Sequence, residues 1–169
     1  VFHTAGGREV RDGGGIKPDV EIKPELMSNF AFVLERENIF FDYSTKYCYE
    51  HRDNRPETGK GHFLTDADMD DFDQFVRTHL RDTVVQVLKL DVDHDLDSLR
   101  SELREQLEED LALRFDYQQG AIQQALLKDK WSQEAAAVLA DKKRYQEILK
   151  PVVADKKQSK KNKSKKTKK

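Results

Sequence analysis

The chain has 169 residues, of which 37% are hydrophobic and another 37% are charged. This balance is typical of a water-exposed protein with a modest core, and the length suits one ordinary domain, alone or with a linker and a tail. The longest apolar runs, such as 29–34 and 135–140, are far too short to cross a bilayer, which requires about 20 apolar residues.

The net charge of −2 combines two regions of opposite sign. Residues 156–169 contain nine lysines and no acidic residue, so removing those nine charges leaves −11 on residues 1–155. An acidic body repels a phosphate backbone, which argues against a nucleic-acid-binding domain. The tail over 151–169 has too little apolar area to fold, and we predict that it is disordered.

Cys48 is the only cysteine, so no internal disulfide can form. This fits a reducing compartment and fits equally a periplasmic protein without disulfides. The chain begins at Val1 with neither an initiator methionine nor a signal sequence, and we therefore expect it to be a piece of a longer protein.

Residues 1–25 alternate strand-like pieces with glycine-rich turns. The strand-like pieces are Val1–Thr4, Arg8–Arg11 and Val20–Ile22, and the turns are Ala5–Gly7 and Asp12–Gly15. This pattern predicts a β-hairpin followed by a return strand. Three short strands do not make a stable sheet alone, so we expect them to belong to a larger sheet outside this sequence.

Helical spacing of apolar residues begins at Leu26, directly after Pro24 and Glu25. It predicts two helical segments and then a polar loop over 52–61. Their apolar positions are Met27, Phe30, Val33 and Leu34, followed by Ile39, Phe40, Tyr43 and Tyr47.

Thr65 is expected to cap a further helix, with Asp66 and Asp68 near the positive end of its dipole. The apolar face of this helix is predicted to hold Met69, Phe72, Phe75, Val76, His79 and Leu80. The β-branched stretch 84–90 fits a short strand or a helical continuation.

Leucines three and four positions apart, from Leu96 to Leu111, predict one long amphipathic helix from about Asp95 to Tyr117. Gly120 is expected to kink or interrupt this helix. Further helices are predicted over 132–140 and 142–149, and Pro151 ends the pattern.

Two separated stretches resemble the carboxyl-terminal processing (tail-specific) serine-lysine peptidases. The first runs from Phe2 through Gly7-Arg8 to Gly15-Ile16-Lys17-Pro18-Asp19, and is similar to the strand-turn-strand that ends the peptidase core of the larger envelope members from Bacteroidetes-type bacteria. The second resembles their helical C-terminal region and comprises Arg114–Gln118, Gly120–Ile122, Asp129, Ala135–Leu139 and Tyr145 with Ile148-Leu149.

The resemblance implies a mainly α protein: residues 1–25 end the β core, 26–150 form a multi-helix C-terminal domain, and 151–169 are the tail. In the family a serine nucleophile activated by a neutral lysine cleaves proteins near their C-termini, and a PDZ module captures the substrate. All three lie upstream of the Gly-Ile-x-Pro-Asp stretch, so residues 1–169 are expected to be inactive. Lys17 occupies the variable position of that motif and receives no catalytic role.

The same resemblance implies a periplasmic or cell-envelope parent whose upstream core binds protein substrates. The helical region is then expected to cover the core, restrict entry or hold protomers of a homo-oligomer together. No cofactor, metal or nucleic-acid partner is implied.

No catalytic, cofactor-binding or metal-binding residue is assigned within the chain. The serines at 28, 44, 98, 101, 132, 159 and 164 lack a Gly-x-Ser-x-Gly elbow, and Ser28, Ser98 and Ser132 are interpreted as helix-start or surface residues. The five histidines show no zinc-site spacing, and His79 is interpreted as packed or half-exposed.

An alternating acidic run, Asp91 to Asp97 with Glu102 at the twelfth position, superficially resembles a calcium loop. Leu96 stands where that loop needs glycine, so acids at a helix N-terminus are the simpler interpretation. Trp131 and the tyrosines at 43, 47, 49, 117 and 145 are predicted to be core or helix-interface groups. The lysine tail is interpreted as a solubilising terminus in preference to a lipid- or nucleic-acid-binding segment.

Two rival classes stay open. The first is a non-enzymatic helical interaction module, which the strand-like N-terminal segment argues against. The second is a nucleic-acid binder acting through the tail; its binding should fall steeply with salt and disappear when residues 156–169 are deleted.

Overall fold

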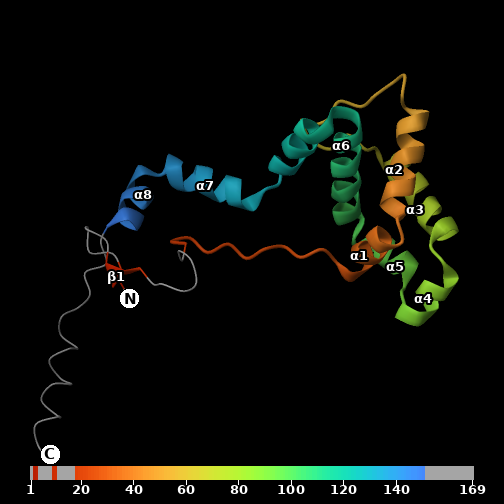
Figure 1. The fold of residues 1–169 in the computed structure, drawn as a ribbon, viewed down its shortest axis with the longest axis horizontal. Helices are drawn as coiled ribbons and strands as arrows, with labels where there is room; N and C mark the ends of the chain where they lie inside the picture. The colour runs from red at the N-terminus through yellow and green to blue at the C-terminus, as the bar shows by residue number, and fades with distance from the viewer. Residues whose placement is uncertain (1, 4–8, 11–17, 151–169) are drawn as a thin grey trace, which may run out of the picture. The chain divides into compact units, whose positions relative to one another are not determined.

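The computed structural model describes residues 2–3, 9–10 and 18–150, and this part of the protein is mainly α-helical (Figure 1). Its helices are α1 (Asn29–Arg36), α2 (Ile39–Glu50), α3 (Asp66–His79), α4 (Asp82–Leu88), α5 (Val92–Ser98), α6 (Arg100–Leu126), α7 (Lys130–Ala140) and α8 (Lys142–Leu149). The stretch that fits either a strand or a helix is thus helical, as α4.

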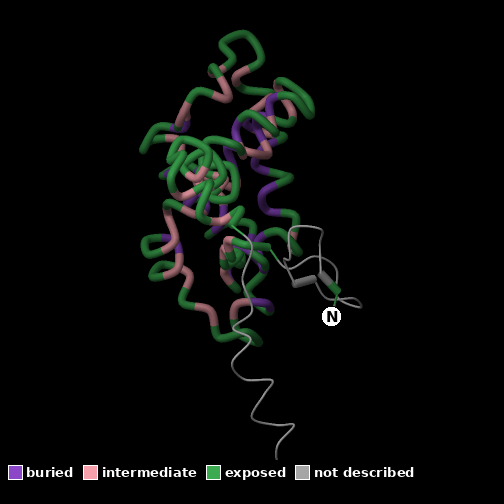
Figure 2. Tube along the Cα trace, turned by 90° about the vertical axis from the view of Figure 1, so that its left-hand side faces the viewer, coloured by how far each residue is buried: buried purple, intermediate pink, exposed green. Residues whose placement is uncertain are grey.

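The chain divides into two compact units. One covers residues 24–132 and is called the helical unit, and the other combines 1–23 with 133–169. In the first, α6 packs mainly against α2 and α5, and α2 also contacts α1 and α3. The predicted apolar faces form its core, except that Met27 and His79 are exposed (Figure 2). Fully buried residues include Leu34, Phe40, Tyr43, Met69, Phe72, Val76, Leu96, Leu103, Leu107 and Leu111.

Aromatic packing joins α2 to α3 at the centre of this core. The rings of Phe40 and Phe72 stack with centroids 5.7 Å apart, and Tyr43 meets Phe72 edge-on at 5.0 Å. Tyr43 also donates a hydrogen bond to the carbonyl of Asp68, 2.9 Å away. The phenol hydroxyl is therefore satisfied although its ring is buried, as buried tyrosines require.

Two helix starts follow from local capping chemistry. The Ser28 side chain accepts a hydrogen bond from Ala31 N, so α1 begins at Asn29 and the predicted start at Leu26 is wrong by one turn. Thr65 and Asp68 form a reciprocal capping box at the start of α3, which confirms the predicted cap.

The predicted single helix from about Asp95 to Tyr117 is wrong at its start, whereas its predicted end coincides with the break at Asp116 and Tyr117. Asp91 caps a separate short helix, α5, by accepting a hydrogen bond from His94 N, and the backbone leaves helical geometry at Leu99. Asp91, Asp93 and Asp95 of the calcium-like run thus lie at the start of α5, as the simpler interpretation expects, while Asp97 lies near its C-terminal end. Leu96 and Leu103 still reach one core because both helices direct leucines into it.

The interruption predicted at Gly120 lies instead at Asp116 and Tyr117 (φ 56°, ψ −155°). Such a conformation is strongly disfavoured for a residue with a side chain. Gly120 is needed for a different reason: a Cβ on it would lie 2.6 Å from the carbonyl oxygen of Ala112. The two halves of α6 therefore approach each other closely and form a helical hairpin.

In the second unit, β1 (Phe2–His3) pairs antiparallel with β2 (Glu9–Val10), with Phe2 opposite Val10. The predicted hairpin pairing is confirmed for these residues. Val20–Ile22 is irregular and not the predicted return strand, because no neighbouring strand pairs with it in the part of the chain that the structure describes. The glycine turns at 5–7 and 12–15 and the tail over 151–169 lie outside the described residues.

The aromatic side chains divide between core and surface. Tyr43 and Tyr47 are buried, as predicted, but Trp131 and Tyr117 expose 52% and 80% of their surfaces. Tyr49 and Tyr145 are exposed too, at 70% and 42%. The prediction that all of them are core or interface groups is therefore wrong for four of six within this chain.

Candidate functional site

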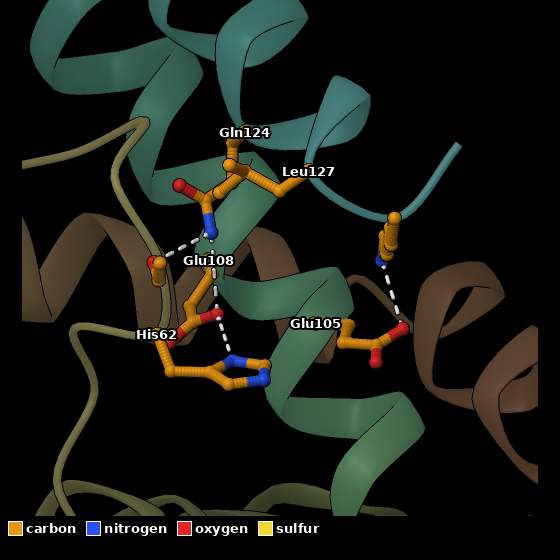
Figure 3. A pocket seen from close by; sticks show the side chains of 7 residues that line it. His62, Glu105, Glu108, Gln124 and Leu127 are labelled. Carbon is orange, nitrogen blue, oxygen red and sulfur yellow. Dashed lines mark hydrogen bonds and ion pairs between the residues drawn. The ribbon is translucent and has the colours of Figure 1, made fainter. Parts of the chain in front are cut away.

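A fully buried carboxylate, that of Glu108 on α6, is the centre of the main polar site in the helical unit (Figure 3). Its Oε1 accepts hydrogen bonds from the backbone N–H groups of Phe63 and Leu64, at 2.8 and 3.1 Å. Its Oε2 accepts from His62 Nδ1 at 2.8 Å and from Gln124 Nε2 at 3.3 Å. Four donors thus occupy the acceptor positions of one carboxylate.

Gln124 fixes the same loop from the other half of α6. Its Oε1 accepts from the N–H of Gly59 at 2.8 Å, and its Nε2 donates to the carbonyl of Gly61 at 3.1 Å. Gly59 has φ +74°, a conformation that favours glycine. Glu108 and Gln124 together therefore bind most of the backbone between Gly59 and Leu64, and we call this arrangement the loop clamp.

The loop clamp depends on the reversal within α6. Residues 16 positions apart on a straight helix would be separated by about 24 Å along its axis. The break at Asp116 and Tyr117 brings Gln124 next to Glu108 instead. Lys128 supports the same geometry from just beyond α6, because its Nζ lies 3.0 Å from both Glu105 and Glu109.

The break itself is held to the loop between α2 and α3. Asp116 accepts hydrogen bonds from Arg55 and from the Thr58 hydroxyl. The Arg55 guanidinium also lies over the Phe115 ring, 5.1 Å from its centroid. Both ends of the loop are thus attached to α6, one at the break and one at the loop clamp.

A pocket of about 320 Å³ opens beside the loop clamp, lined by Gly61, His62, Glu105, Glu108, Gln124, Leu127 and Lys128. Burial works to lower the pKa of Lys128, but hydrogen bonds to Glu109 and Glu105 outweigh it and the net pKa is raised. A lysine that acts as a general base needs the opposite shift. The acceptor positions of Glu108 are filled as well. The charged groups that line the pocket therefore stabilise the fold and are poorly suited to transfer protons.

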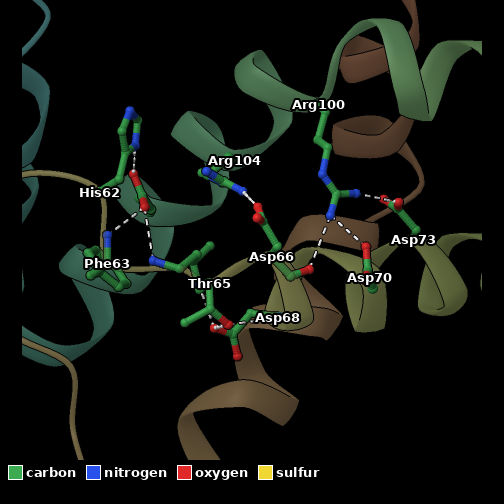
Figure 4. A network of polar contacts seen from close by, with 11 residues as sticks. His62, Phe63, Thr65, Asp66, Asp68, Asp70, Asp73, Arg100 and Arg104 are labelled. Carbon is green, nitrogen blue, oxygen red and sulfur yellow. Dashed lines mark hydrogen bonds and ion pairs between the residues drawn. The ribbon is translucent and has the colours of Figure 1, made fainter.

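A second polar network joins α3 to the start of α6 (Figure 4). Arg100 donates to Asp73 at 2.7 Å, to Asp70 at 2.6 Å and to the carbonyl of Asp66 at 3.1 Å, and Arg104 pairs with Asp66. Burial raises the pKa of Asp73 although Arg100 opposes the shift. The network attaches the acidic first turns of α3 to the helix that carries the loop clamp.

Another carboxylate with an altered pKa lies on the opposite side of α6. Burial and the nearby charge of Glu35 on α1 raise the pKa of Asp110 to about 6, against the opposing effect of Arg114. Burial also raises the pKa of the Cys48 thiol and outweighs Arg114 and Arg55. Cys48 therefore lacks the lowered pKa that activates a nucleophilic cysteine.

The structure places the serines and histidines of the described chain apart. Ser28 caps α1, Ser98 and Ser132 are exposed, and Ser44 is buried in α2 without a hydrogen bond to its Oγ in the described part. His79 is exposed and stacks on Phe75. No group of three or more potential metal ligands comes together among the residues that the structure describes.

Sequence reasoning did not find the loop clamp. Glu108 occupies a helix position between buried Leu107 and buried Leu111, and this is the one signal that could have identified it. A charge on the apolar side of a helix needs specific partners. Those partners, His62 and Gln124, are 46 and 16 residues away, and no local pattern links them to Glu108.

The family model "Probable PDZ-protease, C-terminal helical domain" matches residues 30–86 and 79–139, which together make up more than half of the chain. Neither a curated protein nor a solved structure matches the chain. Within the described residues, each helix is too short or too polar to cross a membrane. Because the match covers most of the helices, this chain belongs to the family of probable PDZ-protease C-terminal helical domains.

Proposed function

We propose that the chain is the C-terminal part of a serine-type carboxyl-terminal processing endopeptidase, whose serine-lysine dyad and PDZ module lie outside residues 1–169. The observation that carries this proposal is the family match over 30–139. It is supported by the glycine-rich opening from Gly7-Arg8 to Pro18-Asp19, which resembles the end of that peptidase core. In this proposal the substrates are proteins with accessible C-termini, and the enzyme works in the periplasm or cell envelope.

The role proposed for the helical unit is to cover the peptidase core or to hold protomers together. The geometry of the loop clamp supports a structural role, because Glu108 is saturated with hydrogen bonds and Lys128 is paired with two glutamates. Neither side chain is free to act as a catalytic base. The unit is therefore best suited to present a rigid surface to another part of the enzyme.

The first test compares residues 1–169 with the longer protein that contains them, using casein and a peptide with a free C-terminus. We expect background cleavage from residues 1–169 and turnover from the longer protein, abolished when its dyad serine is changed to alanine. Robust turnover by residues 1–169 alone would contradict the proposal.

The second test addresses the role of the helical unit. Ending the longer protein at Lys23 is expected to raise cleavage of casein more than that of a short peptide if the unit covers the core. It is expected to lower the particle mass in light scattering if the unit holds protomers together. A truncated enzyme with unchanged selectivity and unchanged mass would exclude both roles.

A non-enzymatic interaction module is the alternative, and exposed aromatic side chains in the helical unit favour it. Phe32, Phe41 and Tyr49 expose 59%, 58% and 70% of their surfaces, and Arg114 lies over the Phe41 ring at 4.5 Å. Aromatic residues and arginine are enriched at protein interfaces. The coding sequence upstream of Val1 separates the two proposals, because only an enzyme requires a serine-lysine domain there.

A further inference from the structure

The pocket beside the loop clamp is large enough to hold a ligand. All of its lining residues, from Gly61 to Lys128, belong to the helical unit, so the shape of the pocket is determined within that unit. Its volume of about 320 Å³ lies at the lower end of the range of about 300–1,000 Å³ that is usual for small-molecule sites. The pocket therefore suits a single side chain or a molecule of similar size.

Two hydrogen-bond acceptors in the pocket have no partner among the described residues. Because Nδ1 of His62 donates to Glu108, Nε2 is the acceptor nitrogen of the neutral ring. Figure 3 shows this second nitrogen turned away from Glu108, toward the side of the pocket on which Glu105 lies. Glu105 uses its Oε2 for Lys128, and its Oε1 is the second open acceptor. A ligand that satisfies both atoms has to supply donors.

The charge around the pocket favours a cation. Its walls contain the carboxylates of Glu105 and Glu108 and one ammonium group, that of Lys128, which gives a formal charge of −1. Glu109 adds a further carboxylate 3.0 Å from Lys128 Nζ. The whole helical unit, residues 24–132, carries 13 basic and 24 acidic side chains, which gives −11. An electrostatic field of this sign concentrates cations and repels anions.

We propose that this pocket binds a cationic side chain on an aliphatic stem, with the guanidinium group of arginine preferred to the ammonium group of lysine. The N–H groups of this ligand donate to His62 Nε2 and Glu105 Oε1, and its stem lies against Leu127. A planar guanidinium donates in several directions at once. It therefore suits two acceptors that belong to different elements, the loop between α2 and α3 and helix α6.

Two other classes of ligand fit the same residues less well. An anion finds only Lys128 as a cationic partner in the pocket, and this ammonium group is already paired with Glu105 and Glu109. A zinc ion takes three or four protein ligands. No group of three His, Cys, Asp or Glu side chains suited to a metal comes together in the described part of the chain.

This inference goes beyond the proposed peptidase function and does not depend on it. Its test measures binding to residues 1–169 and involves no cleavage. A peptidase or an interaction module could each contain such a pocket, so the two proposals succeed or fail separately.

The probes are N-acetyl-arginine methylamide, the corresponding lysine compound and the corresponding citrulline compound, which is uncharged. Each is titrated into the full 169-residue chain. Calorimetry measures the affinity, and NMR shifts of the Gly61 backbone amide and the Gln124 side-chain amide locate the site. We expect the arginine probe to bind most tightly and to shift both signals, and the citrulline probe to bind about tenfold more weakly, because it lacks the charge that strengthens the hydrogen bonds.

Two further probes separate the sources from which the same group could come. A tetrapeptide with a central arginine represents a protein segment, and agmatine represents a small amine with a guanidinium group. Both are expected to bind and to shift the same two signals. Tighter binding of the tetrapeptide identifies a protein segment as the ligand, and tighter binding of agmatine identifies a small molecule.

Glu105→Gln is the decisive variant, and Glu109→Gln is its matched control. Each removes one carboxylate that lies 3.0 Å from Lys128, and the two side chains are 33% and 30% exposed, but only Glu105 lines the pocket. We expect Glu105→Gln to weaken binding of the arginine probe by about tenfold, because a charge-assisted hydrogen bond is lost. Glu109→Gln should change the affinity much less.

Lys128→Gln tests the proposal with a change of the opposite sign. It removes the internal cation that competes for Glu105, so the affinity for the arginine probe should rise several-fold, which a misfolded variant cannot show. Lys130→Gln removes the same charge outside the lining of the pocket and should have a smaller effect.

Three results would overturn the proposal. One is equal affinity for the arginine and citrulline probes, or no binding of either at low salt. Another is an equal loss of affinity in Glu105→Gln and Glu109→Gln, which would mean that the acidic unit attracts cations without a specific site. The third is tighter binding of Zn²⁺ or inorganic phosphate than of the arginine probe at the Gly61 and Gln124 signals.

Discussion

The side-chain amide of Gln124 lies 3.3 Å from the carboxylate of Glu108, although the two residues are 16 positions apart in α6. The contact exists because the chain reverses at Asp116 and Tyr117. As a consequence, both halves of the α6 hairpin form hydrogen bonds to the loop between α2 and α3.

Glu108→Gln is expected to lower the free energy of unfolding by about 2 kcal/mol, because an amide nitrogen then faces backbone N–H groups that need an acceptor. Urea denaturation followed by circular dichroism measures the change. Glu105→Gln is the control: the Glu105 side chain is 33% exposed and pairs with Lys128, so its loss should cost less than about 1 kcal/mol. Equal effects of the two variants would show that the Glu108 carboxylate does not organise the loop.

Gly120→Ala is expected to destabilise the helical unit by about 1–3 kcal/mol, because the added methyl group collides with the Ala112 carbonyl, a backbone atom that cannot move aside. The thermal midpoint reports the loss. Gln119→Ala, at the exposed neighbouring position, should leave the midpoint unchanged or raise it, since alanine favours helix. A neutral Gly120→Ala would contradict the close packing of the hairpin.

Tyr117→Gly is expected to raise the free energy of unfolding by about 1 kcal/mol, because glycine adopts φ 56°, ψ −155° without steric cost. The Tyr117 side chain is 80% exposed, so little packing is lost with it. Tyr117→Ala keeps the strain and serves as the control. Should the glycine variant be no more stable than the alanine variant, the reversal is not strained.

The stability difference between the unmodified chain and Asp110→Asn is expected to depend on pH. The folded-state pKa of Asp110 is about 6, above its ordinary value of 3.8. Its favourable contribution is complete below about pH 4, where the carboxyl is neutral in both states, and is lost as pH rises through about 6. Asp110→Asn should therefore gain stability relative to the unmodified chain between pH 5 and pH 7.5.

Urea denaturation at a series of pH values measures this difference, and Asp53→Asn provides the reference. The Asp53 side chain is 89% exposed and pairs only with its neighbour Arg52 in the described structure. Because an exposed ion pair contributes little to stability, Asp53→Asn is expected to change the free energy of unfolding by less than about 1 kcal/mol. A flat profile for Asp110→Asn would mean that Glu35 and burial do not act on Asp110.

Much of the helical unit could be predicted from apolar spacing, because each buried stripe belongs to one helix. Met69, Phe72 and Val76 are buried as their spacing requires, and Ser28 and Thr65 cap the helices that follow them. Such features depend on residues three to eight positions apart. Interactions between residues close in the sequence are therefore enough to determine the helix caps and the buried faces.

The chain reversal could not be predicted in the same way. The leucine spacing continues from Leu96 through Leu103, although the backbone leaves the helix at Leu99, because both helices face one core. The break at Tyr117 occurs at a residue that normally avoids positive φ, and it is held by contacts between distant residues, among them those of Asp116 with Arg55 and Thr58. The exposure of Trp131 could not be predicted either, because the sequence of an apolar stripe does not show whether another part of the chain covers it.

The attachment of the 51–64 loop to α6 also has a consequence for proteolysis. Trypsin recognises two bonds in this loop, Arg52–Asp53 and Lys60–Gly61, whereas Pro56 blocks cleavage after Arg55. Productive cutting requires several residues to detach from the surface, and here they detach only when the α6 hairpin opens. The cleavage rate at these two bonds therefore reports the opening equilibrium of the α6 hairpin, which lies about forty residues or more further along the chain.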